Sequence, residues 1–210
     1  MTILLATNNA HKAAELSAIL ADGQQGITVL TLRDLPVAIP EPIEDGETLE
    51  ANAYIKAAEV FQATGIPTIA DDTGLEVQAL DGAPGVYSAR YAGPDATYAD
   101  NCRKLIDALA GEENRRAQFR TVLCYTDGLR TLFAEGNVAG TILHEGRGDA
   151  GFGYDPIFLP EGEDQTFAQM NPTQKNSISH RGRALVALRA TLAPIISQAE
   201  LPPQPSPADA

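Results

Sequence analysis

Two adjacent carboxylates, Asp71 and Asp72, follow a short predicted strand at residues 68–70 and precede Thr73 and Gly74. Successive strand side chains point to opposite faces, so one carboxylate can enter a cleft while the other binds backbone groups. Like charges this close persist mainly beside a cation or hydrogen-bond donors, and Mg²⁺ with phosphate oxygens is one natural partner. The pair therefore indicates a metal and phosphate site. An Asx turn before Gly74 is the structural alternative.

A second polar group, residues 7–12 (TNNAHK), lies between an apolar run and a helical pattern. The N-terminus of a helix has unpaired N–H groups and a partial positive charge, which suit a phosphate. Lys12 falls in the first helical turn, where the helix dipole disfavours a cation. The P-loop pattern GxxxxGK[ST] is absent. A capped turn with a solvated lysine and a surface histidine, His11, explains the same residues without a ligand.

Glycines and aromatic residues alternate in residues 151–156 (GFGYDP). Flexible glycines let the backbone approach a flat ligand while an aromatic ring stacks on that ligand. Asp155 can accept hydrogen bonds from the N–H groups of a heterocycle. The segment is thus a candidate base-binding loop, and a tight turn with core aromatics is the alternative.

Three cations and a histidine fall within residues 175–183 (KNSISHRGR), in a chain of net charge −13. A serine of this segment can cap the helix that follows, which would gather Lys175, His180 and Arg181 at its N-terminus. Cations at that end require a nearby anion. A solvated basic face is the alternative. Together the four groups supply phosphate donors, a metal carboxylate and a base-stacking loop, which is typical of a nucleoside triphosphate site.

Strand and helix patterns alternate along the chain, and the elements that they predict would position these groups. One antiparallel pair makes the predicted sheet mixed and the fold class α/β. The length of 210 residues indicates one domain, 1–198, and the proline-rich residues 199–210 are predicted to be a disordered tail. Apolar runs and helical spacing predict strands at 2–6, 27–32, 117–125 and 130–139 and helices from 10 to Gly23 and at 48–63, 98–110 and 179–192.

The composition excludes several classes of protein. Fifteen basic and 28 acidic residues oppose binding to a nucleic-acid polymer. No stretch approaches the ~20 apolar residues of a membrane span, and the first residues lack the basic region of a secretory signal. Cys102 and Cys124 show neither metal-ligand spacing nor a disulfide framework. This pattern predicts reduced thiols in a cytoplasmic protein.

Five segments resemble, in order, the motifs of the inosine/xanthosine triphosphate pyrophosphatase family, from residue 3 to about 192: LLATNNAHKAAEL, ETLEANAYIKA, IADDTGLEVQALDGAPGVYSARYAG, GFGYDPIF and QKNSISHRGRAL. The resemblance implies Mg²⁺-dependent hydrolysis of the noncanonical nucleotides ITP, dITP and XTP to the monophosphate and pyrophosphate. Such hydrolysis cleanses the nucleotide pool of deaminated purines. It also implies an elongated fold of two lobes around a central mixed sheet, a nucleotide cleft between the lobes, and a homodimer.

The resemblance also assigns roles to single positions. Asp72 matches the proton acceptor and a metal ligand. An acid of the 41–47 loop matches a second metal ligand, and we favour Glu44. The other matches are substrate contacts: Thr7, Asn8, Asn9, Ala10, His11 and Lys12 at the triphosphate, Thr73 nearby, Phe152, Gly153, Tyr154 and Asp155 in the base loop, and Lys175, His180 and Arg181.

Hydrogen-bond chemistry predicts how the base is selected. Hypoxanthine and xanthine carry a 6-oxo group, whereas adenine presents a 6-amino donor. A protein donor aimed at O6, from His180, Arg181 or a backbone N–H of the Phe152 loop, would be left unpaired by adenine. An unpaired buried donor costs about 1–3 kcal/mol. Rejection of guanine must depend on its 2-amino group.

Two positions depart from the family's pattern. His11 stands where glycine is usual, and a positive φ there would reshape the turn. Thr73 stands where serine is common and keeps the hydroxyl. Two other functions suit the same cleft: a hydrolase of modified pyrimidine triphosphates or a septum-inhibitor-like paralogue, and a nucleotide-binding regulator without turnover. The acidic pair and Lys175 argue against the regulator.

Overall fold

The computed structural model describes residues 1–21, 27–40 and 42–199, so the predicted tail from residue 200 onward lies outside the described residues. Seven strands form one mixed sheet in the order β2-β1-β3-β5-β6-β7, with β4 paired to β3. The first three strands of that order are parallel, and the others are antiparallel. The strands are β1 (Thr2–Leu5), β2 (Thr28–Thr31), β3 (Thr68–Val77), β4 (Pro84–Gly85), β5 (Arg116–Thr126), β6 (Thr131–Ile142) and β7 (Phe158–Pro160).

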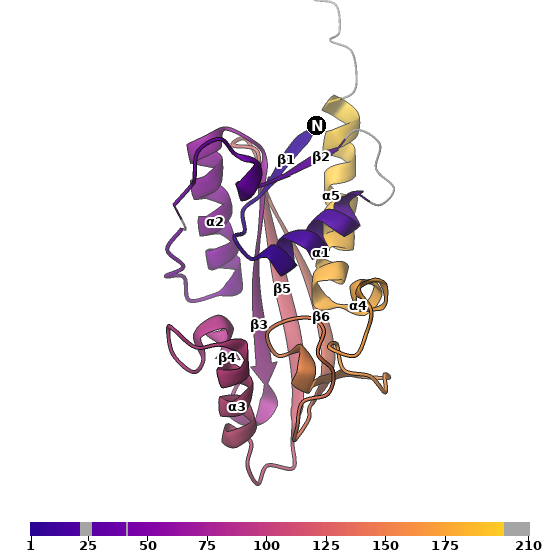
Figure 1. The fold of residues 1–210 in the computed structure, drawn as a ribbon. Coiled ribbons are helices and arrows are strands. Elements are labelled where there is room, and N and C mark those ends of the chain that lie inside the picture. The colour runs from indigo at the N-terminus through magenta and orange to yellow at the C-terminus, as the bar shows by residue number, and fades with distance from the viewer. Residues whose placement is uncertain (22–26, 41, 200–210) are drawn as a thin grey trace, which may run out of the picture.

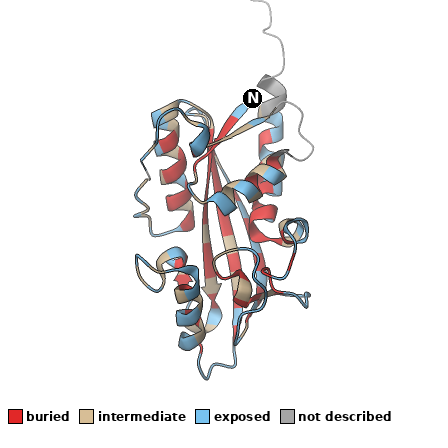
Figure 2. Cartoon of the chain, viewed as in Figure 1, coloured by how far each residue is buried: buried red, intermediate tan, exposed pale blue. Residues whose placement is uncertain are grey.

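The α-helices are α1 (Ala10–Ala21), α2 (Leu49–Thr64), α3 (Tyr98–Ala108), α4 (Pro172–Ile178) and α5 (His180–Ala199). At one end of the sheet, α2 covers one face while α1 and α5 cover the other (Figure 1). Alternation along the strands explains this division, because Leu4 packs with α2 whereas Ile3 and Leu5 pack with α1 and α5. The buried sides of α2 and α5 face the central strands in Figure 2.

The other end of the sheet has a core of its own. Leu75 and Phe119 pack there with Leu105 of α3 and with Phe158 and Phe167. The long strands β3, β5 and β6 connect the two ends, so the molecule is elongated and has two lobes (Figure 1). The predicted α/β fold with a central mixed sheet is therefore confirmed. Among the described residues, no helix has the length and apolar character needed to cross a membrane.

Most predicted elements are found. Thr48 caps α2 by accepting a hydrogen bond from the Ala51 amide at 3.1 Å, and Gly65 ends this helix with φ 67°. The Asp127–Gly128 turn joins β5 and β6, which pair from Arg116↔Thr141 to Thr126↔Thr131.

Two predictions of local structure were wrong. Asp71 and Asp72 do not end a short strand: they lie within β3, opposite Leu123 and Val122 of β5. The Asx turn is therefore excluded, because the backbone there is engaged in a sheet. A separate helix, α4, also precedes the predicted one, with Asn171 as its cap and Pro172 in its first turn. A short polar segment that contains proline has little helical periodicity, which is why it was missed.

Candidate active site

A cavity of about 160 Å³ between the two lobes gathers most of the predicted site residues. Four predicted residues do not line it: Thr7, Asn8, Ala10 and His11. The predicted residues that do line it are Asn9, Lys12, Glu44, Asp72, Thr73, Phe152, Gly153, Tyr154, Asp155, Lys175, His180 and Arg181.

The strand β3 sends its two adjacent carboxylates to opposite faces of the sheet, as predicted. Asp71 faces α1 and α5, where Lys12 Nζ lies 3.0 Å and Arg181 Nη2 3.4 Å from its Oδ2. Burial alone would raise the pKa of Asp71, but Lys12 and Arg181 hold it well below the usual range. Lys12 is thus paired and largely buried, which excludes the solvated lysine.

Asp72 faces α2, where Asn52 and Lys56 lie one helical turn apart. Asn52 Nδ2 donates to Asp72 Oδ2 at 3.2 Å, and the Thr73 amide donates to Oδ1 at 3.0 Å. Lys56 Nζ lies 3.5 Å from Asp72 Oδ1 and 3.0 Å from Glu44 Oε1. Burial raises the pKa of Asp72, an effect that Lys56 and Lys12 offset only in part. This carboxyl is consequently a better proton acceptor than an ordinary aspartate.

The carboxylates of Glu44 and Asp72 fit a hard divalent cation. Both line the cavity, and both lie against one cation, the Lys56 ammonium. Within the described residues, no group of three or more His, Cys, Asp and Glu side chains is placed to hold a metal ion. A pair of carboxylates matches Mg²⁺, which takes one or two carboxylates and completes its shell with substrate phosphates and water.

A buried series of ion pairs connects residues 7–12, called the phosphate turn here, to the base loop at residues 151–156. Glu15 of α1 is central to it: Oε1 lies 2.8 Å from Lys175 Nζ, and Oε2 pairs with Arg181 Nη1. Lys175 Nζ also lies 2.7 Å from Asp155 Oδ2. Lys175 and Arg181 are 4% and 1% exposed, which excludes the solvated basic face. The series runs Lys12, Asp71, Arg181, Glu15, Lys175 and Asp155.

His180 begins α5 and is buried against the ring of Phe119, with ring centroids 4.6 Å apart. The Arg181 amide donates to its Nδ1 at 2.9 Å, which places the ring proton on Nε2. Burial, together with Arg181 and Lys175, lowers the pKa of His180 well below its usual value. In the described part of the chain no protein group bonds Nε2, so a neutral imidazole N–H is available to a ligand. Ser179 caps this helix through the Gly182 amide, at 3.1 Å.

The base loop is a tight turn that also borders the cavity. Asp155 Oδ2 accepts a hydrogen bond from the Phe152 amide at 2.8 Å, and burial raises the pKa of Asp155. A side chain at Gly151, whose φ is 75°, would collide with that carboxylate. Both Phe152 and Tyr154 line the cavity, but Tyr154 is also a buried core residue whose hydroxyl donates to the Ser88 carbonyl at 2.9 Å. The core-aromatic alternative is therefore correct for Tyr154 only.

In the phosphate turn, side-chain oxygens accept hydrogen bonds from the backbone amides of the same segment. Asn9 Oδ1 accepts from the amides of His11 and Lys12, at 3.0 and 3.2 Å, and so caps α1. Thr7 Oγ1 accepts from the Asn9 amide at 3.2 Å, while Asn8 and Ala10 are exposed. His11 lies inside α1, and among the described non-glycine residues a positive φ occurs at Asp81 alone. Histidine therefore does not reshape the turn.

Several residues of the site were not found from the sequence. Asn52 and Lys56 were detectable, because their spacing of four places both on one helical face. Glu15 had no comparable signal, since its partners Lys175 and Arg181 lie 160 and 166 residues away. Glu15, Asn52 and Lys56 support the cavity without lining it, and the lining residues that were missed are Val86, Ser88, Ala89, Arg90, Tyr98, Asn101 and Phe119.

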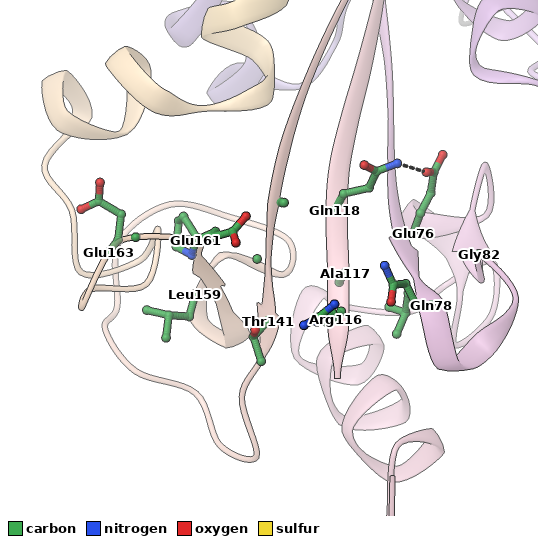
Figure 3. Close-up of a pocket in the computed structure, with 15 residues that line it drawn as sticks. Glu76, Gln78, Gly82, Arg116, Ala117, Gln118, Thr141, Leu159, Glu161 and Glu163 are labelled. Atoms are coloured by element: carbon green, nitrogen blue, oxygen red, sulfur yellow. Dashed lines mark hydrogen bonds between the residues drawn. The ribbon is translucent and has the colours of Figure 1, made fainter. Parts of the chain in front are cut away.

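A larger cavity of about 720 Å³ lies on the sheet away from this site. Figure 3 shows Glu76 and Gln118, hydrogen-bonded at 2.6 Å, on one side of it and Glu161 and Glu163 on the other. Its acids are spread over opposite walls. The smaller cavity, in which cations, carboxylates and aromatic rings converge, is the stronger candidate for chemistry.

Known protein sequences resemble this chain over most of its length. The Ham1 family model matches residues 3–191. A dITP/XTP pyrophosphatase from Desulfotalea psychrophila is 49% identical over 199 residues, which cover 94% of this chain and 88% of that protein. Another protein of the same name, from Lactiplantibacillus plantarum, is 50% identical over 187 residues, covering 88% of this chain and 91% of that protein.

Solved structures show the same fold. The Ham1 protein of Staphylococcus aureus superposes with a TM-score of 0.82 at 38% identity, covering 93% of this chain and all of that one. A HAM1 protein from Coxiella burnetii superposes with a TM-score of 0.83 at 39% identity, covering 92% of this chain and 99% of that one.

Proposed function

Because the chain belongs to the Ham1 family, we propose that it is a nucleoside triphosphate pyrophosphatase that hydrolyses ITP, dITP and XTP. The products are the nucleoside monophosphate and pyrophosphate. One observation carries the proposal: a single cavity joins the carboxylates of Glu44 and Asp72 to a base loop through buried cations. The names of the similar proteins support the same substrates.

The acidic end of the cavity provides the reaction centre. Release of pyrophosphate requires that water attack the α-phosphorus and that the bond from this phosphorus to the oxygen bridging to the β-phosphate break. We assign the attacking water's proton to Asp72, which Asn52 and the Thr73 amide hold in place. Lys12 and Lys175 hold the polyphosphate. Glu44 and Asp72 would hold Mg²⁺, which neutralises charge on the phosphate oxygens.

The aromatic end of the cavity selects the base. Arg181 is engaged by Glu15 and Asp71, so His180 is the better donor to a purine O6. Its Nε2–H matches the 6-oxo group of hypoxanthine and xanthine and opposes the 6-amino group of adenine. Phe152 supplies a ring against which the base stacks.

Pyrophosphate release from ITP, XTP, dITP, ATP and GTP, measured in parallel with Mg²⁺, tests the function. We expect a preference of about a hundredfold or more for the first three, which corresponds to ~2.7 kcal/mol in the transition state. Chelation by EDTA should abolish the activity. Equal rates on all five nucleotides, or no activity on any of them, would show that another substrate class is correct.

We further propose that the enzyme acts as a homodimer, as the family resemblance implies, and in the cytoplasm, as its cysteine usage predicts. Light scattering coupled to size exclusion tests the assembly directly, because a monomer has a mass of 22.2 kDa. A single species near that mass would refute the dimer.

A further inference from the structure

We propose that His11 positions the base loop: its imidazole supports Phe152 from outside the cavity and thereby sets the affinity for the base. This inference rests on the proposed function, because Phe152 is taken to stack on the purine. The proposed reaction assigns no role to the side chain of His11 in the phosphate turn.

The contact is a stacked pair of rings. The centroids of His11 and Phe152 lie 5.2 Å apart with an interplanar angle of 19°. Phe152 lines the cavity and His11 does not, so the imidazole covers the phenyl ring from outside. The Asn9 carboxamide fixes the His11 backbone by accepting from its amide at 3.0 Å.

Phe152 depends on such contacts for its orientation. Its amide is held by Asp155, but Gly151 and Gly153 flank it with φ of 75° and 63°, so the backbone constrains the direction of the ring only weakly. Lys175 Nζ lies 4.7 Å and Arg181 Cζ 5.5 Å from the ring centroid. Both cations are engaged in ion pairs and border the cavity, where a nucleotide would meet them. His11 lies outside the cavity, so a bound base would not displace it from the Phe152 ring.

The same contact joins the two lobes. His11 belongs to α1 of one lobe, and the Phe152 loop packs beside α3 of the other, where Tyr98 lies 6.1 Å from the Phe152 ring. Asn9 Nδ2 donates to Tyr98 Oη at 3.2 Å across the same gap. Within the described residues, the carboxylates of Glu44 and Asp72 make no hydrogen bond or ion pair with His11. Removal of the imidazole should therefore weaken base binding and leave the chemical step intact.

Steady-state kinetics on dITP separate these two effects. We expect His11→Ala to raise KM about 3- to 10-fold, in line with the contribution of an aromatic pair, with kcat within twofold of wild type. His11→Phe restores a ring and should return KM to within twofold. His144→Ala, which removes another exposed histidine, is the matched control and should change neither constant. An unchanged KM in His11→Ala, or a loss confined to kcat, would overturn the proposal.

Proton NMR detects the contact between the His11 and Phe152 rings and does not require an active enzyme. The chain has three histidines, so the imidazole C–H signals are few, and the signal lost in His11→Ala identifies His11. We expect this signal to be displaced by the Phe152 ring current and to move toward the free-histidine position in Phe152→Leu. A signal that does not respond to Phe152→Leu refutes the stack.

The two proposals can fail separately. Should the enzyme prefer a different nucleotide, the proposed function is wrong, and the same KM comparison on that nucleotide decides the role of His11. If there is no turnover at all, the dissociation constant of the monophosphate, measured by calorimetry, takes the place of KM.

Discussion

At the scale of single residues, the pleat of β3 separates two carboxylates that are neighbours in sequence. Asp71 is buried among Lys12 and Arg181 and has a lowered pKa, whereas Asp72 borders the cavity and has a raised one. Lys12 and Arg181 lower the pKa of Asp71, whereas burial raises the pKa of Asp72 by more than Lys56 and Lys12 lower it. Asp71 thus suits a structural ion pair, and Asp72 suits the proton transfer that we propose for it.

Replacing the Asp72 carboxylate tests its assigned role. We expect Asp72→Asn to lower kcat for dITP by about 100-fold or more, the contribution of a general base. The dissociation constant of the monophosphate should change little, because Lys12, Lys175 and the base loop remain. Asp164→Asn, an exposed site outside the cavity, is the control. Near-normal turnover in Asp72→Asn would refute the role.

Substitution of Glu15 tests the buried ion pairs through the pH dependence of the free energy of unfolding. Burial favours a raised pKa for Glu15, but Arg181 and Lys175 lower it below the usual value. A lowered folded pKa gives stability that is fully present above the unfolded value, about 4.3, and is lost as the pH falls through the folded value. We expect Glu15→Gln to cost about 3 kcal/mol in the free energy of unfolding at pH 7.

Urea denaturation of both proteins at a series of pH values measures this cost. The difference between wild type and Glu15→Gln should shrink below pH 4, about where the unfolded carboxyl takes up a proton. A difference that stays constant from pH 7 to pH 3 would mean that packing, and not charge, accounts for the role of Glu15.

At the scale of elements, a close approach of β6 and α5 sets the position of His180. A Cβ at Gly136 would lie 2.2 Å from the His180 carbonyl oxygen and 2.3 Å from the Ala184 amide nitrogen. The absence of a side chain at Gly136 thus lets the helix rest directly on the strand. The first turn of α5 is consequently held by backbone contact.

Filling that contact should therefore disturb both stability and binding. We expect Gly136→Ala to lower the free energy of unfolding by about 1–3 kcal/mol, the usual cost of overpacking, and to raise KM for dITP. Gly146→Ala is the matched control, because its Cβ would lie no closer than 3.4 Å to another side chain. Equal stability of these two variants, measured in urea, would contradict the close approach.

The sequence predicts elements whose signals are local. Thr48 and Gly65 mark α2, and the Asp127–Gly128 turn marks the pairing of β5 with β6. The continuity of β3 was not predictable. Aspartates locally favour turns, and the cations that make Asp71 and Asp72 acceptable in a buried strand come from other segments of the chain. The motifs identified 12 of the 19 residues that line the cavity. Glu15, which organises the buried cations, required the tertiary structure.

At the scale of the whole molecule, a strongly acidic protein gathers several of its cations around one cavity. The net charge is −13, while Lys12, Lys175 and Arg181 are gathered around one cavity between the lobes. A small anion that fits the cavity meets these cations, whereas a long polyanion meets the acidic surface. The size of an anionic ligand should therefore decide its binding.

We expect no binding of duplex DNA at 50 mM salt, because the net charge of −13 repels a polymer of phosphates. Fluorescence anisotropy of a labelled 20-bp duplex, titrated with protein up to about 10 μM, measures it; nonspecific DNA-binding proteins bind such a duplex in this range. The labelled monophosphate serves as the positive control. Saturable binding of the duplex would show an exposed basic surface that the charge balance does not predict.

The six buried charges that run from Lys12 to Asp155 alternate in sign and sum to zero. A change at one position leaves its neighbours unbalanced, so the effect of each substitution depends on what stands beside it. Related chains should consequently exchange these residues as compensating pairs and only seldom singly. A change of base specificity through Lys175 or Asp155 would therefore need a double substitution. Either single substitution leaves a buried charge unpaired and lowers the free energy of unfolding.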